Sequence, residues 1–139
     1  MTEKALWTTV KDAIGHIGHF DRIESHAVTQ GRPDVNYCIS GVTGDVELKV
    51  FDKRKGGFVL RANQNAWFCN RNKAGAKTIF ILARYDNEYG NKTYLLIHGS
   101  KSRELIHDRS YDGWEQQATM KWFGVPDWVQ LRNALLGMD

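Results

Sequence analysis

The sequence predicts an α/β fold in which a central mixed β-sheet is flanked by helices, and three patterns in its 139 residues support this. Apolar and polar residues alternate over 35–39 and again over 46–50, as they do in strands. Apolar residues recur at helical spacing over 3–15. A strand, a helix and a second strand then follow one another between residues 46 and 83, and such a crossover joins parallel strands.

The chain is predicted to begin with a helix over residues 3–15. Leu6, Val10 and Ile14 share one face of this helix, and the GHIG segment ends the pattern. Thr2 is the expected N-terminal cap. This is the first of the helices expected to flank the sheet.

A hairpin is predicted next, after a weaker strand candidate over 19–28. A two-residue turn at 40–41 would place Asp34 directly across from Glu47. A turn at 43–44 would break that pairing, so this register is a hypothesis.

The second half of the chain supplies the remaining helices and strands. These are a helix over 62–75 that stops at Gly75, a buried strand over 78–83 parallel to 46–51, a partner strand over 92–99, a short helix over 102–107 and a final helix over 125–136 with Pro126 in its first turn. Asp127 is expected at the start of that final helix. The predicted order is α-β-β-β-α-β-β-α in one domain, 1–139.

Composition narrows the class of protein. With 42% hydrophobic residues the chain can bury a core, and no segment is apolar for long enough to cross a membrane. No signal peptide is recognised at the N-terminus, so a cytoplasmic location is expected. Cys38 and Cys69 form no CxxC pair and are interpreted as buried thiols. A net charge of +3 does not by itself indicate a nucleic-acid partner.

Three ionisable residues of the hairpin point to chemistry. Asp34 and Glu47 would repel each other and lose solvation on a covered sheet unless a cation compensates them. Mg²⁺ suits that position because it prefers oxygen ligands and is usually held by one or two carboxylates. The carbonyl of Leu48 can supply a third oxygen. Lys49 faces the same side as Glu47, where it can orient a water molecule or neutralise charge on a phosphate.

The segment PDVNYCISGVTGDVELK resembles the signature of the PD-(D/E)XK nuclease superfamily. Pro33-Asp34 and Glu47-Leu48-Lys49 match the two halves of this motif, which are separated by twelve residues. The similarity covers a core of about residues 3–98, and implies a restriction-endonuclease-like fold with a helical extension over about 100–139. The following helix and strand are similar to virus-type replication-repair nuclease (VRR-NUC) domains and Holliday-junction resolvases.

The resemblance implies roles for individual residues. Asp34, Glu47 and Lys49 would be the catalytic set, and Gln64 on the next helix would support the phosphate or the lysine. A further acid is often supplied upstream in this superfamily. Glu24 is the favoured candidate because it lies on the segment that leads towards Asp34, and Glu3 is the alternative.

A nuclease must also hold its substrate, and lysines and arginines that contact phosphates provide affinity without sequence information. Seven basic residues surround the predicted site in the sequence and are the candidate DNA contacts: Arg32, Lys53, Arg54, Lys55, Arg61, Arg71 and Lys73. The chain carries no helix-turn-helix or zinc-finger signature, so recognition of DNA shape is favoured over recognition of bases.

The sequence therefore predicts a Mg²⁺-dependent DNA endonuclease, in which Mn²⁺ should substitute for Mg²⁺. The resemblance implies branched DNA as the substrate, a homodimer, and a phage-type role in recombination, replication or repair, which would place the protein in the host cytoplasm. Two alternatives stay open. One is a restriction-type or DNA-degrading nuclease without branch preference, and the other is a non-catalytic binding module on the same fold.

Overall fold

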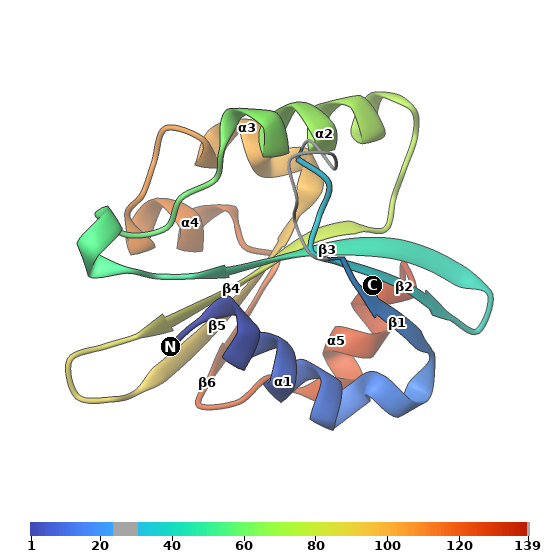
Figure 1. The fold of residues 1–139 in the computed structure, drawn as a ribbon, viewed down its shortest axis with the longest axis horizontal. Helices are drawn as coiled ribbons and strands as arrows, with labels where there is room; N and C mark the ends of the chain where they lie inside the picture. Colours follow the sequence, from blue (N-terminus) through green and yellow to red (C-terminus); the bar gives the residue numbers. More distant parts are fainter. Residues whose placement is uncertain (24–30, 139) are drawn as a thin grey trace.

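A six-stranded mixed β-sheet with helices on both faces forms the protein in the computed structural model, which describes residues 1–23 and 31–138 (Figure 1). The strands follow the spatial order β1-β2-β3-β4-β5-β6. Their bounds are β1 His19–Arg22, β2 Val35–Ile39, β3 Val42–Val50, β4 Ile79–Asp86, β5 Lys92–His98 and β6 Met120–Phe123. The α-helices are α1 Glu3–Ile14, α2 Ala62–Lys73, α3 Ser102–Leu105, α4 Tyr111–Gln117 and α5 Trp128–Leu135. Short 3-10 turns are η1 Gly15–Ile17, η2 Lys53–Lys55 and η3 Gly99–Lys101.

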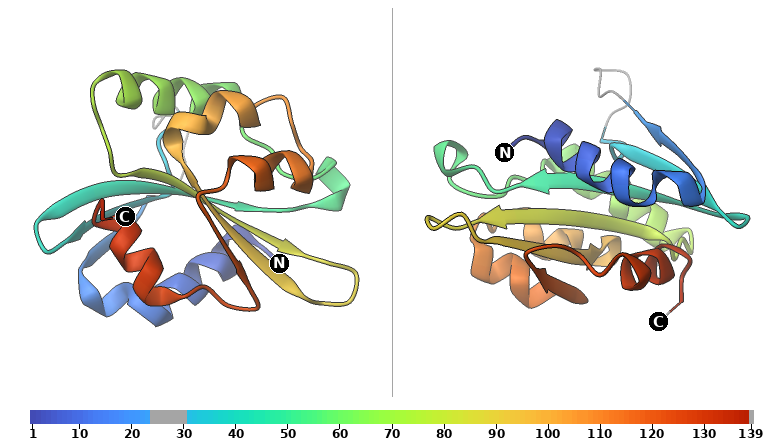
Figure 2. Two further views of the ribbon diagram at one scale, coloured as in Figure 1. Left: turned by 180° about the vertical axis from the view of Figure 1, so that it is seen from behind. Right: turned by 90° about the horizontal axis from the view of Figure 1, so that it is seen from below.

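The helices divide between the two faces of the sheet. α1 and α5 cover one face, and α2, α3 and α4 cover the other, as the views in Figures 1 and 2 show. Each face has its own hydrophobic core, with Leu48 in the core under α1 and α5, and Ile81 in the core under α2. Because side chains alternate along a strand, the neighbours of Leu48 on β3 point to the α2 side. The predicted α/β class is thus confirmed.

The first helix agrees with its prediction. α1 spans Glu3–Ile14, and the hydroxyl of Thr2 accepts a hydrogen bond from the backbone N–H of Ala5 at 3.1 Å. Leu6, Val10 and Ile14 are its buried residues. An N-terminal cap and a single apolar stripe fix where this helix starts and which face it buries.

The β2–β3 hairpin has the predicted register. Both turn residues, Ser40 and Gly41, have positive φ angles, 50° and 83°, which is typical of a two-residue type I′ turn. Ile39 pairs with Val42 across this turn. The alternative turn at 43–44 is wrong.

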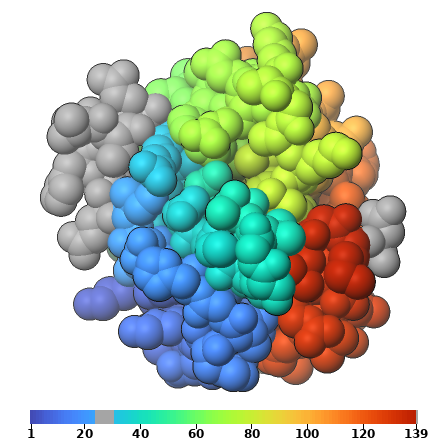
Figure 3. Space-filling model, turned by 90° about the vertical axis from the view of Figure 1, so that its right-hand side faces the viewer, coloured from blue at the N-terminus to red at the C-terminus, as the bar shows by residue number. Residues whose placement is uncertain are grey.

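The turn end of this hairpin is tied to distant parts of the chain. The phenol of Tyr37 donates to the carbonyl of Leu135 at 2.6 Å, and the hydroxyl of Thr78 donates to the carbonyl of Thr43 at 2.6 Å. In the space-filling view the teal hairpin end lies between the blue N-terminal segment, the red C-terminal helix and the yellow-green chain after α2 (Figure 3). These contacts hold β3 in place relative to both helical layers.

The crossover between β3 and β4 also agrees with its prediction. The two strands are parallel, with Glu47 opposite Ile81. α2 connects them and ends at Lys73, followed by Gly75 with a φ of 96°. Glycine adopts this left-handed conformation without a steric penalty, which is why the helix stops here.

The C-terminal region differs more from its prediction. α4 and β6 were not predicted, because segments of seven and four residues are too short to show a clear periodicity. α5 begins at Trp128, and the carboxylate of Asp127 accepts hydrogen bonds from two backbone N–H groups, which confirms Asp127 as the start residue. Pro126 lies before this cap, so its predicted place in the first turn is wrong.

Three further predictions concern single segments and residues. The strand candidate over 19–28 is confirmed as β1 over its first four residues, and residues 24–30 lie outside the described part of the chain. Cys38 and Cys69 are free thiols but only partly buried, so their prediction as buried residues is wrong. The thiol of Cys69 donates to the side-chain oxygen of Asn65 at 3.4 Å. Among the described residues, no helix has the length and apolar character that a membrane span requires.

Candidate functional site

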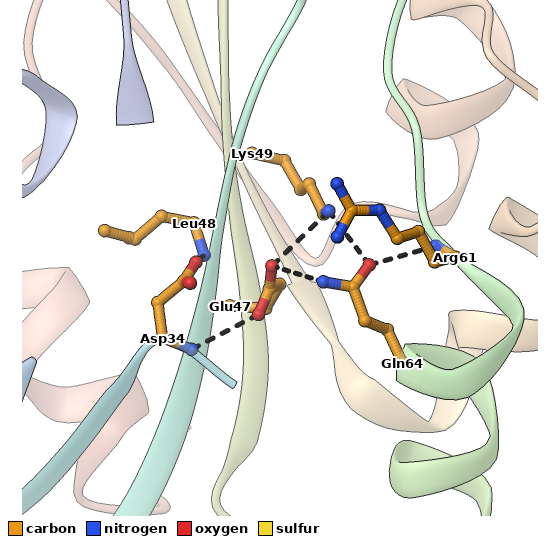
Figure 4. Close-up of polar contacts among 6 residues, drawn as sticks. All are labelled: Asp34, Glu47, Leu48, Lys49, Arg61 and Gln64. Atoms are coloured by element: carbon orange, nitrogen blue, oxygen red, sulfur yellow. Dashed lines mark hydrogen bonds and ion pairs between the residues drawn. The ribbon is translucent and has the colours of Figure 1, made fainter. Parts of the chain in front are cut away.

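Asp34 and Glu47 lie next to each other where β2 begins. The backbone N–H of Asp34 donates to Oε1 of Glu47 at 3.2 Å, and Oδ2 of Asp34 accepts from the backbone N–H of Leu48 at 3.0 Å (Figure 4). The carbonyl of Asp34 in turn accepts from the N–H of Ile23 at 2.6 Å. Backbone contacts from two neighbouring segments therefore fix this carboxylate at the end of the hairpin.

The carbonyl of Leu48 is directed to the same place. In a strand, the N–H and C=O of one residue point towards the same neighbouring strand. The N–H of Leu48 bonds to the carboxylate of Asp34, which stands where the β2 ladder stops. The carbonyl of Leu48 therefore points to the edge of β3 on which Asp34 lies.

Glu47, Lys49 and Gln64 form a buried polar network. Nζ of Lys49 donates to Oε1 of Gln64 at 2.9 Å and lies 3.4 Å from Oε2 of Glu47. Nε2 of Gln64 donates to the same Oε2 at 2.9 Å (Figure 4). Glu47 and Lys49 are only 2% and 6% exposed. Buried polar groups are stable only when their donors and acceptors are satisfied, and Gln64 accepts from Lys49 and donates to Glu47 here.

The start of α2 holds Gln64 in this position. Gln64 is the third residue of the helix, and its Oε1 accepts a hydrogen bond from the backbone N–H of Arg61 at 2.9 Å. A glutamine at this position commonly reaches back to the residue that precedes the helix. The same amide oxygen therefore caps α2 and binds Lys49, so the helix start and the lysine are positioned together.

Burial changes the protonation of Glu47. Loss of hydration raises the pKa of its carboxyl group to about 8, and the negative charge of Asp34 acts in the same direction. The ammonium group of Lys49 opposes this rise but does not cancel it. Without a further cation, Glu47 therefore keeps a proton near neutral pH.

These residues line an open cleft of about 420 Å³, which we call the site cleft. Its lining residues are Glu3, Arg22, Ile23, Asp34, Glu47, Lys49, Arg61 and Gln64. The acids Asp34 and Glu47 and the two arginines Arg22 and Arg61 therefore line the same cleft, and the arginines can contact an anion there. Glu3, the alternative third acid, lies on this cleft, whereas Glu24 lies outside the described residues.

The donor set of the site cleft fits a hard divalent cation. Two carboxylates that approach each other and one backbone carbonyl are oxygen ligands of the kind that Mg²⁺ uses, with water and substrate phosphate completing its shell. Within residues 1–23 and 31–138, no three Asp, Glu, His or Cys side chains gather into one group. The candidate protein ligands are the carboxylates of Asp34 and Glu47, which lie beside each other, and the carbonyl of Leu48.

The predicted DNA-binding residues fall into three groups. Arg61 lies on the site cleft, and Arg54 and Lys55 line a neighbouring pocket. Arg71 stacks over the ring of Trp67, with 4.7 Å between guanidinium and ring centre, at the far end of α2. Arg71 does not line the site cleft, and neither do the three remaining residues. Lys73 lines a separate pocket, and Lys53 and Arg32 are exposed.

Arg22 is a site residue that the sequence analysis missed. It pairs with Val35 across β1 and β2, and so stands beside the start of the hairpin. The sequence did predict a strand over 19–22. It did not specify how this strand pairs with β2, and so it did not place Arg22 beside Asp34.

Comparisons with protein-family models, with curated proteins and with solved structures found no match to this chain.

Proposed function

We propose that this protein is a metal-dependent endodeoxyribonuclease of the PD-(D/E)XK type, which hydrolyses phosphodiester bonds. One observation carries the proposal. Asp34, Glu47, Lys49 and Gln64 come from two separate segments of the chain and meet in one cleft, with direct hydrogen bonds among them. A hairpin whose Glu47 and Lys49 merely faced water would leave both exposed, and both are buried.

The carboxylates of Asp34 and Glu47 and the carbonyl of Leu48 would hold Mg²⁺ or Mn²⁺. Such an ion supplies positive charge that stabilises the developing charge on a phosphate and lowers the pKa of water. Lys49 places its ammonium group beside these oxygens, where it can orient the attacking water or donate to the phosphate.

Other residues around the cleft would position the lysine and the substrate. Gln64 keeps Lys49 in place through the 2.9 Å hydrogen bond. Arg22 and Arg61, on the cleft wall, can hold the phosphate backbone through paired N–H donors.

The resemblance to VRR-NUC domains and Holliday-junction resolvases supports the finer parts of the proposal. These are a restriction-endonuclease-like core, branched DNA as the substrate, action as a homodimer, and a phage-type role in recombination or repair. The mixed sheet with a parallel β3–β4 pair and the α2 crossover is compatible with such a core.

Cleavage of three labelled DNAs tests the function. A four-way junction, a linear duplex and a single strand are each incubated with protein in Mg²⁺ or in EDTA. Cutting of the junction in Mg²⁺ alone is the expected result, and equal cutting of the duplex would point to a general DNA-degrading nuclease. No cutting of any DNA at any Mg²⁺ or Mn²⁺ concentration refutes the nuclease proposal and leaves a binding module.

Lys49→Ala separates binding from chemistry. This variant should still bind the junction but lose cleavage, because Lys49 acts on the reacting groups while arginines outside the acid pair provide affinity. Lys11→Ala is the matched control, since Lys11 is an exposed lysine of α1 that does not line the site cleft. Cleavage by Lys49→Ala at the rate of this control would exclude a catalytic role for Lys49.

A further inference from the structure

A second pocket opens directly beside the site cleft. It has a volume of about 360 Å³ and lies between the N-terminal end of α1 and the segment 52–61. Glu3, Lys49 and Arg61 line both cavities. The two cavities are therefore neighbours, and we call the second one the side pocket.

The side pocket has a basic wall. Arg54 and Lys55 lie on it, and Arg61 stands at the junction with the site cleft. Asp52 is the acid on the same wall, and its carboxylate already accepts hydrogen bonds from the backbone and side chain of Arg54 at 2.9 and 3.4 Å. Four side-chain cations thus face the pocket against Asp52 and Glu3, since Lys49 also lines it. The guanidinium of Arg54 keeps further N–H donors for a ligand.

This wall is held in place by the C-terminal part of the chain. The guanidinium of Arg109 donates to the carbonyl of Lys55 at 2.6 Å, and the carbonyl of Arg109 accepts from the N–H of Phe58 at 3.0 Å. The ring of Phe58 stacks on buried Trp114, with 4.4 Å between ring centres. Gly57 approaches the carbonyl of Arg109 so closely that a side chain at this position would collide with it.

Because its backbone is anchored in this way, this basic segment differs from an ordinary solvated loop. Its backbone closes on itself through the paired hydrogen bonds between Asp52 and Gly57, and then docks on the segment before α4. A fixed backbone keeps the attachment points of its charged side chains at a constant distance from the site cleft, which reduces the entropy lost when a ligand binds.

We propose, resting on the proposed function, that the side pocket is the subsite for the nucleotide next to the scissile phosphate. Its backbone phosphate would be bound by Arg54 and Lys55, and Arg109 is the positioning residue that holds these two in place. The volume suits a ligand the size of one nucleotide, since pockets for small ligands begin at about 300 Å³. The strand would then pass from the site cleft over Arg61 towards the 3-10 turn η2.

Binding without cleavage tests this subsite. The affinity of the full-length protein for a labelled four-way junction is measured in EDTA at several salt concentrations. The double variant Arg54→Ala/Lys55→Ala should weaken binding at least tenfold, and should lower the slope of log K against log salt by about one to two, because each lost phosphate contact removes roughly 0.9. Lys101→Ala/Lys11→Ala, which removes two exposed lysines outside both cavities, is the control.

The outcomes distinguish the subsite from the nuclease proposal. A slope and affinity equal to those of the control double variant overturn the subsite, and so does failure of the wild-type protein to bind the junction. Neither result depends on cleavage. If the wild-type protein binds with the expected slope change but never cuts DNA, the subsite stands and the nuclease proposal fails.

Arg109 is tested by a pair of substitutions. Arg109→Ala removes the hydrogen bond to Lys55 and should weaken binding roughly two- to tenfold, the range for one net hydrogen bond, and raise KM more than it lowers kcat. Arg109→Lys keeps a donor within reach and should restore most of the affinity. Urea unfolding of both variants checks that they fold alike. Equal affinity of Arg109→Ala and wild type would remove Arg109 from the proposal.

Discussion

Replacement of Glu47 by glutamine tests the electrostatics of the site in the absence of metal. Glutamine keeps the shape of glutamate but cannot ionise. Its amide nitrogen must face one of the donors that bond to Glu47, and this cost is the same at every pH. We therefore expect the stability of Glu47→Gln relative to wild type to be higher at pH 8 than at pH 5.

The magnitude follows from the pKa of Glu47. In the unfolded chain this carboxyl group titrates near its ordinary value of 4.5, whereas in the folded protein it titrates at about 8. Between these values the folded protein keeps a proton that the unfolded chain has lost, so the stability contributed by this group is present below pH 4.5 and is lost as the pH rises towards 8. At about 1.4 kcal/mol per pKa unit, the free energy of unfolding of wild type should fall by about 3 to 4 kcal/mol relative to the variant between pH 5 and pH 8.

Urea unfolding in EDTA at both pH values measures this difference. Titrating groups that do not contact Glu47 are common to the two proteins and cancel in the comparison. Glu88→Gln, a substitution of an exposed acid in the turn between β4 and β5, is the matched control and should follow wild type. If wild type and Glu47→Gln show the same pH dependence, Glu47 ionises as readily when buried as in water, and the reasoning about this site is wrong.

Three further expectations concern other residues. Asp34→Asn should remove most of the rise in Tm that saturating Mg²⁺ gives wild type, a rise equivalent to about 2.7 kcal/mol at 100 times Kd, as measured by thermal unfolding with and without the ion. Gln64→Ala should reduce the cleavage rate roughly 10- to 100-fold, as is usual for partners that orient catalytic groups. Gln116→Ala on α4 is the control. An unchanged rate in Gln64→Ala would mean that Lys49 does not need the hydrogen bond to Gln64. Tyr37→Phe leaves the carbonyl of Leu135 buried without its 2.6 Å partner and should cost about 1–3 kcal/mol in urea unfolding while cleavage continues; loss of cleavage in folded protein would show that the hairpin end is coupled to the site.

The acid pair could be predicted from the sequence because its geometry is local. A two-residue turn at Ser40 and Gly41 fixes the register of the whole hairpin, and that register alone brings Asp34 to Glu47. Gln64 was predicted through a resemblance, and its double role as helix cap and lysine partner became visible only with the start of α2 in place.

The residues that could not be predicted depend on contacts between distant segments. Arg22 reaches the site cleft through a strand pairing that no turn specifies. Arg71 is different, because it lies on the same predicted helix as Gln64 and about two turns further along it, so its distance from the site could have been predicted from the sequence. The contact between Arg109 and Lys55 spans more than fifty positions along the chain, so no periodic pattern encodes it.

The hydrogen bond from Lys49 to Gln64 joins two segments that a growing chain makes one after the other. A newly synthesised hairpin already carries both acids and the lysine, but their partner arrives only when the crossover has been completed and α2 has docked. Under the proposed activity, incomplete copies of this enzyme would be unable to damage the DNA around them. Under that activity, only a completely folded chain would cleave DNA.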